Sequence, residues 1–224
     1  MNEQEMQSTI YDKAWREEYP DDSDRIELVR LVAGGLTPGS ILDVGCGDGR
    51  ILEPLNGRLA VYGCDVSAEA VNQARARMQC CRHMLFEEIP YPSGWFEYAF
   101  AGETIEHTID TDFFLYEINR VLKPGGTLLL TYPNIRTLTG VAMLLAGYPP
   151  RFAARYRSPH YRDFTQKSIK LALENNGFIA ERFLGCQMLT RYLPGWSKTV
   201  LVVARKVSGA VYDPAKIVDF NLWK

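Results

Sequence analysis

The stretch SILDVGCGDGR, residues 40–50, constrains the fold more than any other part of the chain. Its first half is apolar enough for a buried strand. Its second half places glycines at alternate positions, Gly45, Gly47 and Gly49. Glycine permits positive φ angles and lets the backbone approach a ligand closely, as it does where a parallel strand leads into the next helix. The stretch therefore predicts a ligand-binding turn at the carboxyl edge of a parallel sheet.

The rest of the chain alternates apolar runs with segments of helical periodicity. Strands are expected at residues 40–44, 60–65, around 83, 96–102, 127–133, 179–186 and 198–206, and helices at 23–32 with Ser23 or Asp24 as N-cap, 50–55, 68–78, 112–122 and 165–178. This alternation is typical of βαβ crossovers. We therefore expect an α/β fold, a doubly wound and mostly parallel sheet with helices on both faces.

The glycine spacing narrows the choice of ligand. Gly49 follows Gly47 by two residues, whereas a dinucleotide fingerprint places its third glycine three residues after the second. The turn also lacks the Lys and Ser/Thr that end a phosphate-binding loop. Asp65 ends the next strand 22 residues after Asp43, where a carboxylate can accept hydrogen bonds from both hydroxyls of a ribose. The pattern favours a nucleoside ligand without a pyrophosphate.

Four motifs, in order, resemble those of the class I S-adenosylmethionine-dependent methyltransferases. They are DVGCGDG from Asp43, YGCDVS from Tyr62, FAGETIEH from Phe100 and VLKPGGTLLLTYPN from Val121. The resemblance covers residues 11–206. It implies a Rossmann-like sheet of seven strands with the last strand antiparallel. It also implies S-adenosyl-L-methionine as cofactor and S-adenosyl-L-homocysteine as product.

The same resemblance assigns cofactor-binding residues. Asp43 and the amides of Gly45 and Gly47 would hold the methionine end, and Asp65 would hold the ribose. The other expected contacts are Gly102 and Glu103 on the sulfonium side, Val66 and a stacked Phe86 on the adenine, and Tyr11 and Trp15 from the N-terminal segment. Phe86 stands roughly where the family often carries an acidic residue for the adenine amino group.

The segment ETIEH, residues 103–107, carries the candidate catalytic groups. A helix after Glu103 would place Glu103, Glu106 and His107 on one face. Three interpretations stay open: a capped turn with partly buried side chains, a general base drawn from Glu106, His107 and His160, or a metal site formed by those three with Glu103. The metal alternative rests on a resemblance to the metal-binding segment of some RNA 3′-end methyltransferases.

Residues 134–163 are an insertion after the fifth strand, at the edge where ligands bind. They contain one acid and five arginines: Arg136, Arg151, Arg155, Arg157 and Arg162. Because arginine suits carboxylate and phosphate groups, we expect an acceptor lid for an anionic compound, with a solvated cationic face as the alternative. The apolar part, LTGVAMLLAGY, could instead pack on the core or touch a lipid surface. The lid also resembles those of glycan-assembly methyltransferases and MetW-type proteins.

Composition sets the remaining expectations. The 224 residues suggest a single domain, with N-terminal cap helices over residues 1–33, the lid and a C-terminal tail over 207–224. A net charge of −2 gives no reason to expect nucleic acid. No leader or membrane span is evident, which favours a cytoplasmic location with at most peripheral membrane contact. Five cysteines without a CxxC spacing are expected to be reduced thiols.

The predicted function is methyl transfer from S-adenosylmethionine to a small or medium acceptor that is carboxylated, phosphorylated or lipid-linked, with O-methylation favoured. One alternative is a MetW-like protein that binds the cofactor and acts through a partner enzyme. The other is a metal-dependent methyltransferase of the RNA 3′-end type.

Overall fold

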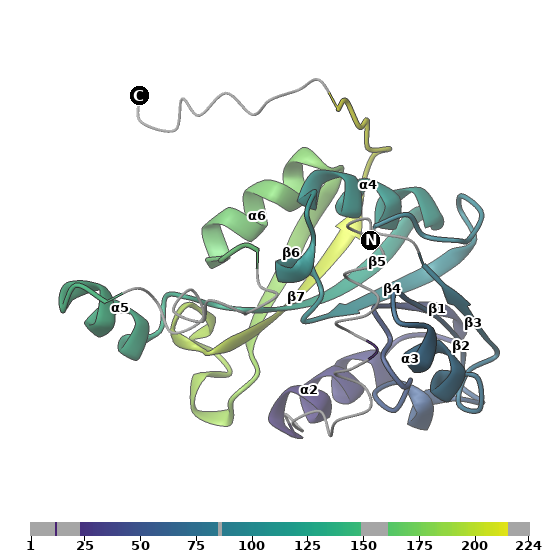
Figure 1. The fold of residues 1–224 in the computed structure, drawn as a ribbon, viewed down its shortest axis with the longest axis horizontal. Coiled ribbons are helices and arrows are strands. Elements are labelled where there is room, and N and C mark those ends of the chain that lie inside the picture. The colour runs from purple at the N-terminus through teal and green to yellow at the C-terminus, as the bar shows by residue number, and fades with distance from the viewer. Residues whose placement is uncertain (1–11, 13–22, 85–86, 149–160, 215–224) are drawn as a thin grey trace.

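The computed structural model describes residues 12, 23–84, 87–148 and 161–214. Within these ranges one seven-stranded sheet has the order β3-β2-β1-β4-β5-β7-β6 (Figure 1). The strands are β1 Gly39–Val44, β2 Leu59–Asp65, β3 Cys80–His83, β4 Phe96–Gly102, β5 Leu122–Pro133, β6 Phe178–Gly185 and β7 Thr199–Lys206. Strands β1 to β5 pair in parallel, and β7 is antiparallel to both β5 and β6. The predicted doubly wound sheet with an antiparallel last strand is confirmed.

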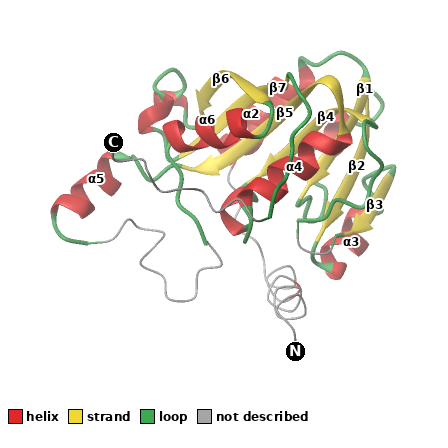
Figure 2. Ribbon diagram, turned by 90° about the horizontal axis from the view of Figure 1, so that it is seen from above, coloured by secondary structure: helices red, strands yellow, loops and turns green. Residues whose placement is uncertain are grey.

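Helices cover both faces of this sheet (Figures 1 and 2). Helices α2 (Ser23–Gly34) and α3 (Ala68–Ala74) pack on one face, and α4 (Thr111–Val121) and α6 (Gln166–Asn175) pack on the other. Helix α5 (Leu138–Leu145) stands away from the sheet in both views. Among the described helices, none is long and apolar enough to span a bilayer.

Neighbouring residues of a central strand point to opposite faces. In β1, Leu42 packs in the cluster that contains Phe114 of α4, whereas Ile41 packs in the cluster that contains Leu28 of α2. Both side chains of the pair are fully buried. Because both faces are covered, the strand is a continuous apolar run rather than an alternating one.

The predicted helix at residues 50–55 is wrong, and the helix considered for the residues after Glu103 does not form. Residues 50–55 form turns and one 3-10 turn, η1 Glu53–Leu55. Pro54 supplies no N–H and Gly57 follows with φ 88°, so an α-helix cannot propagate through this segment. The helix expected after Glu103 is likewise a single 3-10 turn, η2 Ile105–His107. The loop that follows β1 must therefore be fixed by something other than a helix.

Two further helix boundaries differ from expectation. Helix α2 includes Ser23, which the sequence suggested as its N-cap, and extends past Val32 to Gly34. Helix α3 stops at Ala74 rather than Met78, although Ser67 caps its start by accepting a hydrogen bond from the Ala70 amide. These differences leave the order of elements unchanged.

Candidate functional site

The carboxyl ends of β1, β2 and β4 lie side by side. Val44 of β1 is in register with Cys64 of β2 and with Ala101 of β4. Asp65 and Gly102 each come directly after these paired positions, and Gly45 follows Val44. The sheet therefore brings together three chain segments that the sequence assigned to one ligand.

The neighbouring atoms leave no room for a side chain at Gly45, the first residue of the glycine loop. Gly45 has φ 72°, and a Cβ there would lie 2.6 Å from the Thr104 hydroxyl oxygen. Gly47 also has a positive φ, 55°. The Gly45 amide donates to the Cys64 carbonyl at 2.8 Å, and the Gly47 amide donates to Asp65 Oδ2 at 2.8 Å. The resemblance assigned these amides to the methionine end, but both already donate hydrogen bonds within the chain. The loop therefore lets a ligand approach the backbone closely without offering it these two N–H groups.

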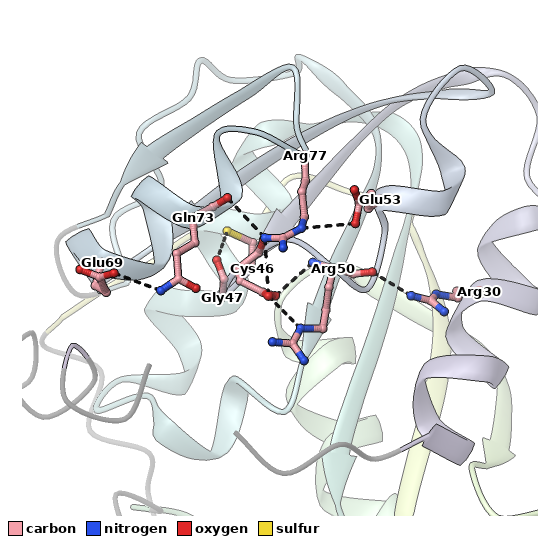
Figure 3. Close-up of polar contacts among 9 residues, drawn as sticks. Arg30, Cys46, Gly47, Arg50, Glu53, Glu69, Gln73 and Arg77 are labelled. Atoms are coloured by element: carbon pink, nitrogen blue, oxygen red, sulfur yellow. Dashed lines mark hydrogen bonds and ion pairs between the residues drawn. The ribbon is translucent and has the colours of Figure 1, made fainter. Parts of the chain in front are cut away.

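Two arginines hold this loop in place of the missing helix (Figure 3). Arg30 of α2 donates from Nε to the Ile51 carbonyl at 3.0 Å and from Nη2 to the Arg50 carbonyl at 2.8 Å. Arg77, beyond α3, donates from Nη1 to the Asp48 carbonyl at 2.9 Å. Neither arginine was predicted from the sequence, because the partners of both lie 20 or more residues away.

A second contact that the sequence missed lies beside Asp65. Each Asp65 oxygen accepts one backbone N–H, Oδ2 from Gly47 and Oδ1 from Ser67 at 2.8 Å. The Ser67 hydroxyl in turn donates to Asp12 Oδ1 at 2.5 Å. Asp12 thus contacts the residue that follows Val66, close to the end of β2. Burial raises the pKa of Asp65 despite the two amides that stabilise its charge.

Asp43 lies at the centre of the site with 1% of its surface exposed. Burial, together with the nearby Asp65 carboxylate, raises the pKa of Asp43 well above its usual range, while Arg25 of α2 opposes the shift. Asp43 Oδ2 is buried without a hydrogen-bond partner in the described part of the chain. An ammonium group placed here would satisfy that oxygen. Arg25 is another site residue that was not predicted from the sequence.

The backbone after β4 is strained at Glu103, which has φ 51°, rare for a residue with a side chain. The Glu103 amide donates to both the carbonyl and the hydroxyl of Thr131, each at 3.1 Å, and this holds the unusual conformation. At the preceding residue, a Cβ on Gly102 would lie 2.5 Å from the Phe100 ring. Substitution of Gly102 therefore requires the Phe100 ring to move.

Glu106 and His107 share the 3-10 turn that follows. His107 Nε2 lies 3.8 Å from Glu106 Oε1, and the His107 side chain keeps 14% of its surface exposed against 1% for Glu106. Burial, and then the nearby Glu103 carboxylate, raise the pKa of Glu106 well above its usual range. His107 is thus the more accessible member of the pair.

The described residues offer no cluster of histidine, cysteine or acidic side chains able to hold a metal ion. Glu103, Glu106 and His107 are all among them, whereas His160, the fourth predicted ligand, lies outside the described residues. The other predicted site residues outside the described ranges are Tyr11, Trp15 and Phe86. Val66 is partly buried against the core, and its carbonyl accepts from His83 Nε2 at 2.9 Å.

The fold and this site define a class I S-adenosylmethionine-dependent methyltransferase. Residues 42–130 match the family model described as "Methyltransferase domain". Residues 42–130 therefore carry the methyltransferase domain of this family, whose cofactor is S-adenosylmethionine. The residues fit that cofactor, because the site combines a close-approach glycine loop, the buried acceptor Asp65 and a second carboxylate, Asp43, with an unsatisfied oxygen.

Individual proteins named as methyltransferases are similar to this chain. The human mitochondrial ubiquinone biosynthesis O-methyltransferase is 29% identical over 160 residues, which are 65% of this chain and 42% of that protein. The ubiquinone biosynthesis O-methyltransferase of Xanthomonas campestris is 28% identical over 205 residues, 84% of this chain and 73% of that protein. The chain spans less than half the length of the mammalian mitochondrial relatives that it matches.

Solved structures share the fold. In the complex between the Haloferax volcanii Trm112 methyltransferase activator and a putative methyltransferase, one chain superposes with a TM-score of 0.65 at 18% identity. The match covers 93% of this chain and 99% of that chain. At this identity the likeness establishes the architecture alone.

Proposed function

We propose that this chain transfers the methyl group of S-adenosylmethionine to an oxygen of a small or medium, anionic acceptor. The observation that carries the proposal is the convergence of Asp43, Asp65 and the glycine loop beside the Glu106–His107 pair at one edge of the sheet. The relatives named ubiquinone biosynthesis O-methyltransferase support oxygen as the reacting atom.

In this proposal Asp65 accepts hydrogen bonds from the ribose hydroxyls and Asp43 accepts from the methionine ammonium. When bound, the cofactor supplies a methyl group made electrophilic by a positively charged sulfur. The protein then has to orient the acceptor and exclude water. His107 would take the proton of the acceptor hydroxyl as that oxygen accepts the methyl group, and Glu106 would position His107.

The lid is tied to this pair. The backbone amides of Tyr161 and Arg162, at its end, donate to the Glu106 carbonyl at 2.9 and 3.3 Å. Arg162 also donates to the Ile109 carbonyl at 2.7 Å, and Arg136 stacks over Trp196 at 5.3 Å from the ring centroid. Two of the five lid arginines thus have structural partners. We propose that the other three, Arg151, Arg155 and Arg157, bind the anionic part of the acceptor. These three residues lie outside the described ranges.

Formation of S-adenosylhomocysteine with a panel of hydroxylated carboxylates and phosphates tests the function. We expect His107→Ala to lower kcat and kcat/KM together, by roughly 10²-fold, the low end for a general base. Wild-type activity should rise with pH, because the neutral imidazole is the form that can accept a proton. A pH profile that keeps this rise in His107→Ala would contradict the assignment of His107.

Two alternatives give other results. A MetW-like protein would bind the cofactor with micromolar affinity or better, show no turnover with any acceptor, and gain activity only with a co-purifying enzyme. A metal-dependent enzyme would lose all activity in a chelator and regain it with Mg²⁺ or Mn²⁺, which prefer oxygen ligands. We expect activity to persist in the chelator.

A further inference from the structure

Two segments at the carboxyl edge of the sheet expose apolar side chains to solvent. One runs from α5 to Tyr148, and the other is the stretch from η3 (Met188–Thr190) to η4 (Pro194–Trp196) between β6 and β7. In α5 the single buried residue is Gly140, while Leu145 is 85% exposed. In the other segment Leu189 is 95% exposed and Tyr192 is 88% exposed. Together these segments form what we call the apolar edge surface, residues 138–148 and 188–196.

The two segments are joined at their base. Asn134, which follows β5, donates from its amide to the Lys198 carbonyl at 2.8 Å and from Nδ2 to the Ser197 carbonyl at 2.9 Å. The Arg136 guanidinium lies over the Trp196 ring, 5.3 Å from its centroid. These contacts hold the start of the lid against the connection between β6 and β7. Two distant parts of the sequence therefore meet where the two segments of the apolar edge surface begin and end, at residues 134–136 and 196–198.

The part of the sequence that carries this surface is rich in basic residues. Residues 134–198 contain ten Lys and Arg against three Asp and Glu, although the whole chain contains 25 against 27. In residues 134–148 and 186–198 the charged residues are Arg136, Arg191 and Lys198, all basic. The rest of the chain is correspondingly acidic. Exposed leucines flanked only by cations are the pattern of a segment that lies in the interface of an anionic membrane.

A second copy of the chain fits the surface less well. A symmetric dimer places the same patch of both subunits in contact, so the basic residues would face their own copies. Such like-charge contacts disfavour association. An anionic lipid surface attracts the same residues, and its acyl region accepts the leucines.

We propose that the apolar edge surface docks on an anionic lipid bilayer, with the leucines of α5 and of η3 entering the interface and Arg136, Arg191 and Lys198 contacting lipid headgroups. The docking does not depend on methyl transfer, because none of these residues belongs to the cofactor site. Helix α5 has eight residues, so it lies in the interface and does not span the bilayer.

Flotation of the full chain with vesicles tests this proposal without cofactor. Vesicles of phosphatidylcholine alone are compared with vesicles that also contain phosphatidylglycerol. We expect binding to the anionic vesicles, at least about tenfold weaker binding to the neutral ones, and release in high salt. Absence of binding to anionic vesicles, or equal binding to both kinds, would overturn the proposal.

A triple variant identifies the surface. Leu144→Ser/Leu145→Ser/Leu189→Ser should weaken vesicle binding at least about tenfold. The matched control replaces three exposed aliphatic residues elsewhere, Leu31→Ser/Val207→Ser/Val211→Ser, and should bind as the wild type does. Wild-type binding by the first variant would overturn the assignment.

Two measurements exclude other occupants of the surface. A wild-type dimer in light scattering that the first variant dissociates would show that a second copy covers the leucines. A melting temperature that falls further in the first variant than in the control would show that the chain covers them itself. Either result would overturn membrane docking, and we expect equal melting temperatures and no patch-dependent dimer.

Discussion

At the scale of single residues, Asp65 connects loop geometry to ligand binding. Its two oxygens accept the amides of Gly47 and Ser67, so the carboxylate fixes the glycine loop on one side and the start of α3 on the other. A carboxylate has about four acceptor sites, and two remain for a ribose. Asp65 therefore holds the glycine loop in place, and it is also the residue that we expect to bind the ribose.

Asp65→Ala should weaken S-adenosylmethionine binding at least about tenfold, because it removes charge-assisted hydrogen bonds of ~1.5–3 kcal/mol each. Calorimetric titration measures the change. The control is Asp48→Asn, in the same loop, where the buried carboxylate pairs with Arg50 and Arg77. Unchanged affinity in Asp65→Ala would remove the ribose assignment, and an equal loss in the control would attribute the effect to loop disorder.

Glu106 should make stability depend on pH. Burial raises its pKa in the folded chain, so the folded state keeps the Glu106 proton to a higher pH than the unfolded state does. The stability that Glu106 contributes is therefore full below about pH 4.3, the ordinary glutamate value, and is lost as pH rises through the raised pKa. Glu106→Gln has no such proton to lose.

We expect Glu106→Gln to melt at a higher temperature than the wild type at pH 8, because the glutamine cannot ionise in the buried site. The difference should shrink as the pH falls toward 4.5. Glu88→Gln, at an exposed position, is the control and should track the wild type. A constant offset at all pH values would point to packing instead of ionisation.

At the scale of elements, the strands were predictable because burial on both faces leaves a local trace, an apolar run such as residues 127–133. The support of the glycine loop was not predictable. It rests on Arg30 and Arg77 reaching carbonyls 20 or more residues away, and no local pattern marks an arginine for that task. For the same reason Asp43 and Asp65 were predictable from the sequence, whereas Arg25 was not.

The 3-10 turn at residues 105–107 shows a second limit. The letters ETIEH are compatible with a helix, but Glu103 has a positive φ with its amide bonded to Thr131 of β5, and the chain is already extended at Thr108. Helical spacing had predicted three side chains on one face. The structure instead buries Glu106 and leaves His107 partly exposed. This difference in exposure could not be read from the sequence.

The lid is the element for which acceptor binding can be separated from cofactor binding. Neutralising Arg151, Arg155 and Arg157 together to glutamine should raise the KM for an anionic acceptor while the cofactor dissociation constant stays constant. Steady-state kinetics and calorimetric titration on the same preparation measure both. Equal losses for the two ligands would indicate misfolding, and no change in KM would leave these arginines a solvated cationic face.

At the scale of the whole molecule, one sheet edge carries every proposed function. The cofactor site lies at the ends of β1, β2 and β4, and the lid and the apolar edge surface lie at the ends of β5 and β6 and the start of β7. The antiparallel β7 makes this possible, because its first residue, Thr199, pairs with the last residue of β5, Pro133. Cofactor, acceptor and membrane would thus meet the protein from the same side.

Because the cofactor site draws on α2, β1, β2 and β4, ligand binding should stabilise the whole fold rather than one loop. S-adenosylhomocysteine at about 100 times its dissociation constant adds ~2.7 kcal/mol, which corresponds to a rise in melting temperature of about 5–11 °C for a chain of this length. A thermal melt followed by both fluorescence and circular dichroism measures it. Both probes should shift together, whereas a shift in tryptophan fluorescence alone would mean that the ligand orders a local segment. Asp65→Ala should need at least about ten times more ligand for the same shift, and an unshifted wild type at saturating ligand would refute the cofactor site.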